Sequence, residues 1–191
     1  AETPLRAVSR FIALAAVAVF TYAAHGQHVL LEAEQFADLG GWDLDQQSMD
    51  QMGSPYLLAH GLGVPVRDAV TTVKFPAPGT YHVWVRTRDW VAPWNAPGAP
   101  GKFQLLVNGK PLAETFGTKG ADWHWQDGGT VQVGGEMQIA LHDLTGFEGR
   151  CDAILFSKDV AFVPPNELAE LTKFRRTALG QAPALQPLPR L

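Results

Sequence analysis

Short stretches of alternating apolar and polar residues, separated by glycine and proline turns, make up most of the chain after residue 27. The clearest stretch is 81–88, whose even-numbered positions are His82, Trp84, Arg86 and Arg88 and whose odd-numbered positions are Tyr, Val, Val and Thr. This period of two residues predicts a strand with one face in a core. Because imidazole, indole and guanidinium groups are costly to bury without partners, we expect the opposite face to be open to water or a ligand.

Further strands are predicted at 28–34, 70–75, 102–107, 111–116, 130–133, 136–142 and 151–157. Asn108-Gly109 between two of them is the sequence most typical of a two-residue hairpin, and Gly134-Gly135 is interpreted as the turn of a second hairpin. Strands do not alternate with long helices, which argues against a doubly wound fold. The many short strands and turns predict an all-β protein built as an antiparallel β-sandwich.

The first 26 residues have the pattern of an export signal. Arg6 and Arg10 precede the apolar run 11–24, and Ala24-His25-Gly26 fits a cleavage site between small residues. The apolar run is too short for a comfortable transmembrane helix, so we expect no stable membrane span. We therefore predict a secreted, periplasmic or cell-surface protein. The alternative is an apolar N-terminal helix that the mature protein keeps.

The chain divides into three parts on this basis. A signal-like segment covers 1–26, a β-sandwich module covers 27–160, and a short helix with a proline-rich tail covers 161–191. Pro164-Pro165-Asn166 is a plausible helix start, and the helix itself is predicted over 167–179. The tail after it is interpreted as a linker, or as a segment resting on another domain.

Composition and charge exclude some classes of partner. The chain has 191 residues, a formal net charge of −4 and no basic tract, which argues against nucleic acid as the partner. Its one cysteine, Cys151, lies in an apolar stretch. An internal disulfide and a cysteine metal site are therefore excluded, and we interpret Cys151 as a small buried apolar residue.

The tryptophans supply the first functional indication. Of the six in the chain, five lie close to Arg, Asp, His and Pro rather than in aliphatic runs: Trp84, Trp90, Trp94, Trp123 and Trp125. Indole rings beside hydrogen-bonding groups suit a pyranose, which has an apolar C–H face and a rim of hydroxyls. We predict a carbohydrate-binding site made from Trp84, Arg86, Arg88, Trp90, Trp94, His60, Trp123, Trp125 and Asp143.

Each of these assignments has a structural alternative. The indoles of Trp90 and Trp94 could instead close over the core, and at least one of Trp123 and Trp125 is expected to be buried. A pair of guanidiniums suits carboxylates, which makes an acidic sugar attractive as the ligand. Salt bridges from this arginine pair to Asp89, Asp143 or Glu148 are the alternative to ligand binding. His60 could equally cap a loop.

A spaced series of segments resembles known carbohydrate-binding modules. It consists of Glu32-Ala33-Glu34, the segment 78–86, Leu106-Val107-Asn108-Gly109 and Cys151-Asp152-Ala153-Ile154. The series is similar to carbohydrate-binding modules of families six and thirty-five, which are calcium-containing β-sandwich jelly rolls of the galactose-binding-like type. The resemblance implies a structural Ca²⁺ site to which Glu32, Glu34 and Asp152 contribute carboxylate oxygens. The alternative is that the two glutamates are the solvent face of an edge strand.

Two other segments carry a closer resemblance. The segments 45–61 and 90–94 are similar to the N-terminal module of secreted bacterial FAD-dependent oxidoreductases and xanthan-lyase-like proteins. The tail after Pro164 resembles the start of the linker into that enzyme domain. The chain holds no flavin-binding glycine-rich turn, so no FAD is expected in it. The resemblance implies an accessory module of a polysaccharide-processing protein, with a downstream catalytic domain or self-assembly as its further partners.

No catalytic motif supports an enzymatic role. The chain has no G-x-S-x-G, no H-E-x-x-H, no phosphate-binding loop and no dinucleotide fingerprint. We therefore expect non-catalytic binding of an extracellular polysaccharide, with an affinity of about micromolar to millimolar because an open platform buries little ligand. Two alternatives stay open: a structural subunit of an extracellular filament or surface layer, and a polysaccharide lyase or glycosidase.

Overall fold

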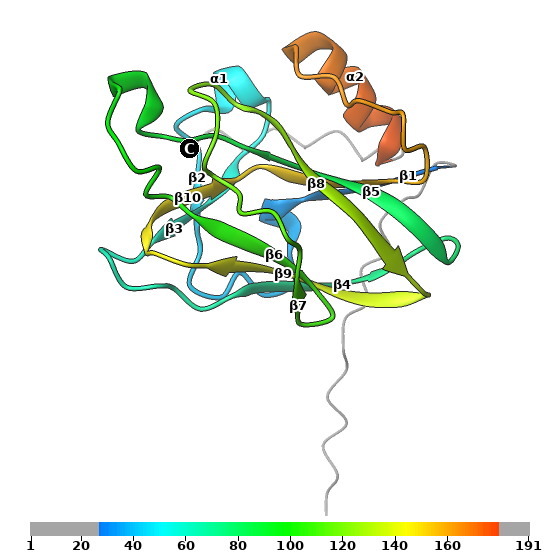
Figure 1. The fold of residues 1–191 in the computed structure, drawn as a ribbon. Helices are drawn as coiled ribbons and strands as arrows, with labels where there is room; N and C mark the ends of the chain where they lie inside the picture. The colour runs from blue at the N-terminus through cyan, green and yellow to red at the C-terminus, as the bar shows by residue number, and fades with distance from the viewer. Residues whose placement is uncertain (1–26, 180–191) are drawn as a thin grey trace, which may run out of the picture.

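Two layers of antiparallel strands face one another in the computed structural model, which describes residues 27–179 (Figure 1). The strands are β1 (His28–Glu32), β2 (Asp43–Asp45), β3 (Tyr56–His60), β4 (Ala69–Lys74), β5 (Gly79–Thr87), β6 (Phe103–Val107), β7 (Lys110–Pro111), β8 (His124–Val133), β9 (Glu136–Asp143), β10 (Phe147–Cys151) and β11 (Ala153–Ser157). The helices are α1 (Met49–Met52) and α2 (Leu168–Ala178), with 3-10 turns η1 (Ala33–Gln35) and η2 (Ala92–Trp94). The predictions for 1–26 and for the proline-rich tail lie outside the described residues.

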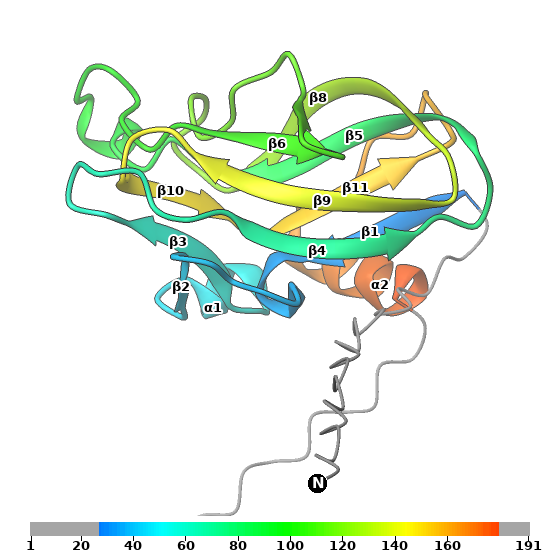
Figure 2. The ribbon, with the colours of Figure 1, turned by 90° about the horizontal axis from the view of Figure 1, so that it is seen from below.

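The predicted β-sandwich is confirmed. One layer is the sheet β1-β11-β5-β8, and the other is β4-β9-β6-β7, continued by the smaller sheet β10-β3-β2. Figure 2 shows the second layer in front of the first. The apolar residues between the layers come from every sheet, for example Val83 and Ile154 from one layer, Leu105 and Ile139 from the other, and Leu57 from the smaller sheet.

The strand predicted at 81–88 is present as β5, and its inner face is confirmed as core. Tyr81, Val83 and Val85 have no measurable exposure. The expectation that the outer face is open is wrong, because α2 covers it. Leu171 of α2 lies in a second apolar cluster with Leu30 and Leu155 of the neighbouring strands, and this cluster includes tryptophans of β5 and β8. Figure 1 shows α2 lying across the outside of this sheet.

The two predicted hairpins have different outcomes. Asn108 and Gly109 have φ values of 47° and 74°, as a tight turn between β6 and β7 requires. The returning strand is two residues long rather than six, although the Leu112 amide just after it still donates to the Leu105 carbonyl at 2.9 Å. The second hairpin is wrong: β8 pairs with β5, whereas β9 pairs with β4 and β6. Gly134-Gly135 therefore carries the chain from one layer to the other.

The final predicted strand, 151–157, is interrupted at Asp152. The chain leaves β10, which pairs with β3, and enters β11, which pairs with β1 and β5. Asp152 is held at this crossing because its amide donates to the Arg86 carbonyl at 2.9 Å and its carbonyl accepts from the Ala33 amide at 2.9 Å. Cys151 just before it is fully buried, as expected, and burial raises the pKa of its thiol.

The C-terminal helix is confirmed and is packed on the sandwich. Its N-cap is Glu167, whose side chain accepts from the amides of Ala169 and Glu170 at 3.1 and 3.2 Å. The indole of Trp125 on β8 donates to the Pro165 carbonyl at 2.9 Å, which fixes the approach to the helix. Among residues 27–179, no helix is long and apolar enough to cross a membrane.

Candidate functional site

The covered outer face of β5 and β8 accounts for three of the predicted ligand-binding residues. Trp84 and Trp125 pack in the apolar cluster beneath α2, and Arg86 is only 2% exposed. The Arg86 guanidinium donates to Asp152 Oδ2 at 2.8 Å, to Met52 Sδ at 3.0 Å and to Asn166 Oδ1 at 3.2 Å. A ligand at the surface cannot reach the Arg86 guanidinium, and Trp84 keeps only part of its surface exposed. The interpretation of this face as a sugar platform is therefore corrected by the structure.

Two more predicted residues are internal supports. Trp123 is buried against Tyr56, with ring centroids 4.9 Å apart, and shares a cluster with Met52. Both Trp123 and Trp125 are thus buried, so the expectation that at least one of them would be is confirmed. Asp143 is 1% exposed, and its carboxylate accepts from the amides of Val66, Thr145 and Gly146 at 2.9–3.1 Å. Asp143 therefore shapes two loops and does not face solvent.

The three carboxylates that the family resemblance assigns to calcium do come together, but they meet arginines. Asp152 Oδ2 lies 2.8 Å from Arg86 Nη1 and 2.6 Å from Arg175 Nη2 of α2. Glu32 Oε1 lies 2.8 Å from Arg175 Nε, and Ser54 donates to Asp152 Oδ1 at 3.1 Å. Both oxygens of Asp152 and one oxygen of Glu32 are therefore already bound by guanidinium or hydroxyl groups.

Burial of this cluster shifts the protonation of its carboxyls. Desolvation, together with the nearby Glu32 charge, raises the pKa of Glu34 to about 9. Desolvation also raises the pKa of Glu32, to about 7, although Arg175 opposes the shift. Within residues 27–179, no three His, Cys, Asp or Glu side chains are arranged to hold a metal ion. The residues at this position do not fit the calcium site that the resemblance implies.

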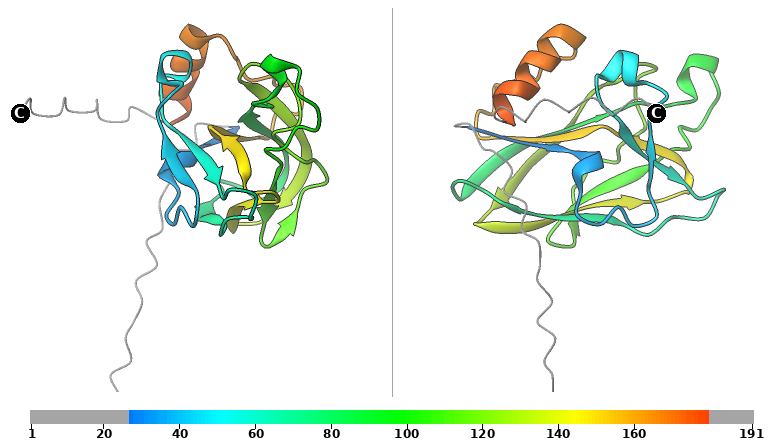
Figure 3. Two further views of the ribbon diagram at one scale, coloured as in Figure 1. Left: turned by 90° about the vertical axis from the view of Figure 1, so that its left-hand side faces the viewer. Right: turned by 180° about the vertical axis from the view of Figure 1, so that it is seen from behind.

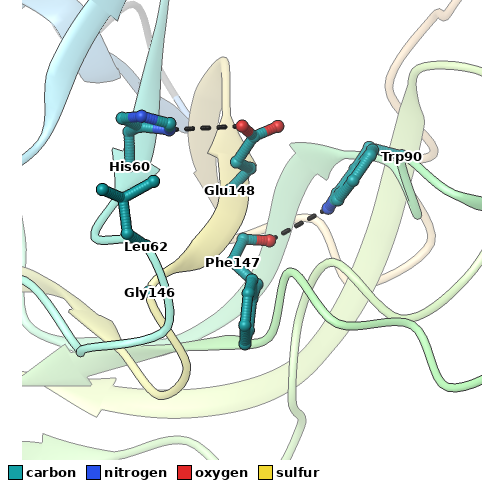
Figure 4. A pocket seen from close by; sticks show the side chains of 6 residues that line it. All are labelled: His60, Leu62, Trp90, Gly146, Phe147 and Glu148. Atoms are coloured by element: carbon teal, nitrogen blue, oxygen red, sulfur yellow. Dashed lines mark hydrogen bonds and ion pairs between the residues drawn. The ribbon is translucent and has the colours of Figure 1, made fainter.

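A hollow of about 230 Å³ lies at the opposite end of β5 from its turn with β4, where three loops meet (Figure 4). It is lined by residues from the end of β3 and the β3–β4 loop, from the loop 88–102 between β5 and β6 (the tryptophan loop), and from the β9–β10 turn with the start of β10: His60, Leu62, Trp90, Gly146, Phe147 and Glu148. Two residues predicted from the sequence, His60 and Trp90, lie in it. The loops come from distant parts of the chain, and the sandwich brings them together.

A polar network forms the floor of the hollow. His60 Nδ1 lies 3.2 Å from Glu148 Oε1, and the other oxygen of Glu148 is 3.1 Å from Arg150 Nη2. The Arg150 guanidinium lies over the ring of Trp90, 5.1 Å from its centroid, while the indole nitrogen of Trp90 donates to the Phe147 carbonyl at 2.9 Å. One face and the nitrogen of Trp90 are thus occupied by the protein, so Trp90 anchors its loop (Figure 4).

Exposed apolar side chains lie in and beside the hollow: Leu62 and Phe147 line it, and Trp94 contacts the lining residue Trp90. Leu62 is 81% exposed, Trp94 70% and Phe147 50%, which are high values for side chains of this size. Trp94 meets Trp90 edge to face, with ring centroids 6.3 Å apart and an interplanar angle of 71°. Leu62 and Glu148 both have positive φ values, 51° and 61°, although neither is glycine. Backbone strain of this kind concentrates at sites that bind ligands.

Four residues of this region were not among the predicted ligand-binding residues: Leu62, Phe147, Glu148 and Arg150. The available signal was the Gly146-Phe147-Glu148-Gly149 segment, in which an aromatic residue stands between two glycines. The remaining predicted residue, Arg88, is half-buried beyond the end of β5 and does not line the hollow. Burial and the neighbouring Arg150 lower the pKa of Arg88.

Solved structures with a similar fold include modules that bind carbohydrate. A GH26-CBM35 β-(1,4)-mannanase from Podospora anserina matches with a TM-score of 0.56 and 16% identity, over 72% of this chain and 29% of that one. A family 35 carbohydrate-binding module from Clostridium thermocellum matches with a TM-score of 0.53 and 20% identity, over 69% and 98%. The C-terminal CBM6 of LamC, a marine laminarinase from Zobellia galactanivorans, matches with a TM-score of 0.50 and 16% identity, over 69% and 99%.

These likenesses establish the fold of the chain as that of the family 6 and family 35 carbohydrate-binding modules. The chain spans under a third of the mannanase, whereas it covers nearly the whole of the two isolated modules. The sequence itself matches no protein-family model and no curated protein. None of the three structures bears on the association with FAD-dependent oxidoreductases, which stays a prediction.

Proposed function

We propose that this chain binds an extracellular polysaccharide without catalysis, and that it does so at the hollow between the β3–β4 loop, the tryptophan loop and the β9–β10 turn. The observation that carries the proposal is the pair of exposed apolar side chains, Leu62 and Phe147, that line the hollow with His60 and Glu148, with exposed Trp94 next to Trp90 of the same lining. Exposed rings stack on the C–H faces of sugars, and the polar pair accepts and donates hydrogen bonds to hydroxyls. The fold shared with carbohydrate-binding modules supports this assignment.

Trp90 and Trp94 have different roles in this proposal, whereas the sequence predicted that both would bind the ligand. Trp94 offers its open ring to a ligand, whereas Trp90 is held by Arg150 and the Phe147 carbonyl and supports Trp94 from behind. Phe147 stands on the other wall as a second stacking surface. A hollow of about 230 Å³ holds one sugar unit of a chain, so a micromolar to millimolar affinity follows.

The arrangement of charges argues against the enzymatic alternatives. A glycosidase needs two carboxyl groups facing one bond, and Glu148 is the one carboxylate among the residues that line the hollow. A lyase needs a free guanidinium to neutralise a uronate, but Arg150 is committed to Glu148 and to the Trp90 ring. The preference for an acidic sugar has no free guanidinium to support it at this site, since Arg86 is buried and Arg88 does not line the hollow. Secretion and a role as an accessory module belong to the same proposal.

A glycan array probed with the full chain tests this function, and it should contain both neutral and uronate polysaccharides. Trp94→Ala and Phe147→Ala are each expected to weaken binding about tenfold, since an aromatic stacking contact contributes on the order of 1 kcal/mol or more. Val163→Ala serves as the control, because Val163 is also 70% exposed but does not line the hollow. Binding that neither aromatic substitution reduces would move the site elsewhere. No binding to any glycan would overturn the proposal.

A further inference from the structure

The buried carboxylates at the end of β1 are tied to a helix that comes last in the described chain. Glu32 ends β1, Asp152 stands between β10 and β11, and Arg175 reaches both of them from α2. Arg175 also donates from Nη1 to the carbonyl of Met52, the last residue of α1. Figure 3 shows α1 and α2 side by side on the same face of the sandwich. One guanidinium thus joins the first strand, the last crossing and both helices.

The charges of this cluster nearly balance without any added ion. Three carboxyl groups, those of Glu32, Glu34 and Asp152, face the two guanidiniums of Arg86 and Arg175. Both arginines are more than nine-tenths buried, as are Glu32 and Asp152. An unpaired charge at this depth would be strongly unfavourable, so the partners must be inside the protein.

A calcium ion has little to bind here. It takes about six to eight oxygen ligands at roughly 2.3–2.6 Å. Both oxygens of Asp152 and one oxygen of Glu32 already contact guanidinium or hydroxyl groups, and the Met52 carbonyl accepts from Arg175. Among the carboxylate oxygens of the cluster, the buried ones without a hydrogen bond are Glu32 Oε2 and Glu34 Oε2. Two oxygens do not make a calcium site.

We propose that Arg175 is the resident cation of this carboxylate cluster, in the role that the family resemblance assigns to calcium. The fold then needs no metal ion, and α2 belongs to the folding unit of the sandwich because it supplies the cation. The inference is independent of the proposed glycan binding, since Arg175 does not line the hollow.

Thermal unfolding of the full chain, measured by tryptophan fluorescence in EDTA and in excess CaCl₂, tests the inference. Arg175→Ala is compared with Arg176→Ala, the same substitution at the exposed neighbour on the same helix. The wild type is expected to unfold at the same temperature in both buffers. In EDTA, Arg175→Ala should unfold about 10 °C lower, since it leaves buried carboxylates unpaired, whereas Arg176→Ala should shift by less than about 2 °C. Calcium should restore part of the loss in Arg175→Ala.

Three results would overturn the inference. One is a wild-type unfolding temperature that rises by more than about 5 °C in CaCl₂, together with terbium luminescence that the wild type gives and Glu34→Gln loses. Another is an Arg175→Ala protein as stable as Arg176→Ala. A third is the absence of any recovery of Arg175→Ala in calcium. Should Arg175→Ala fail to fold, the wild-type comparison and the terbium titration still decide the question.

Discussion

Replacing Glu34 with glutamine should make the stability of this protein less dependent on pH. Glu34 lies in the 3-10 turn η1 after β1, and its Oε2 is buried without a hydrogen bond in the described part of the chain. Three carboxyl groups against two guanidiniums leave one carboxyl in excess. Desolvation by burial, together with the Glu32 charge, raises the pKa of Glu34 from 4.5 to about 9, so this is the carboxyl that stays protonated at neutral pH.

The size of the effect follows from linkage. A carboxyl whose pKa is raised in the folded state contributes its full stability below the unfolded pKa, here 4.5, and loses it as the pH rises through about 9. Each pH unit in this window costs about 1.4 kcal/mol. Between pH 5 and pH 7, the wild type should therefore lose about 2–3 kcal/mol that Glu34→Gln keeps. The fall in stability continues up to about pH 9.

Urea denaturation of the full chain at pH 5 and pH 7, followed by tryptophan fluorescence, measures this difference. The relevant quantity is the difference in free energy of unfolding between wild type and variant, and how this difference changes with pH. Groups that titrate alike in both proteins cancel from it. Glu136→Gln, at an exposed glutamate that begins β9, is the matched control and should leave the difference constant. A difference between wild type and Glu34→Gln that is equal at both pH values would refute the reasoning.

Two further substitution pairs test the packing beneath α2 and the loops around the hollow. Trp125→Phe should lower the free energy of unfolding about 1 kcal/mol more than Trp84→Phe, because Trp125 Nε1 donates to the Pro165 carbonyl while the buried Trp84 Nε1 has no partner in residues 27–179. Equal costs in urea denaturation would contradict this. Gly146→Ala should weaken glycan binding about tenfold or more, since Gly146 has φ +68° and a Cβ there would lie 2.2 Å from the Val64 carbonyl oxygen. Gly134→Ala, where no atom lies within 4 Å, is the control on the same affinity gel, and equal binding by both would count against the assigned site.

The strands of this fold could be predicted because each carries its own pattern. The inner face of β5, the turn at Asn108-Gly109 and the start of α2 all follow from residues within a few positions of one another. Their pairing could not be predicted in the same way. Gly134-Gly135 has the composition of a hairpin turn. The strands on either side of it, β8 and β9, belong to different layers, and this depends on their pairing with strands distant in sequence.

The candidate site was partly predictable for a related reason. A stretch such as 81–88 shows that His82, Trp84 and Arg86 share a face, but not what lies against that face. The partners of Arg86 come from Asp152 and Met52, and the cover comes from α2, all of them distant in sequence. Polar alternation therefore indicates a strand face whose polar side chains need hydrogen-bonding partners. Water can supply these partners, but so can other parts of the protein.

Hydrogen bonds beneath the proposed binding site hold its loops in place. The β3–β4 loop is fixed to the β9–β10 turn because Gly61 and Gly63 donate their amides to the Gly146 carbonyl at 3.0 and 3.2 Å. Buried Asp143 accepts from the amides of both segments. A loop already held in this way loses little conformational entropy when a ligand binds, so a small and shallow site can still be selective. Of the residues predicted at the ligand, Asp143 thus lies below the hollow and holds its loops, whereas Trp90 lines the hollow and contacts Trp94.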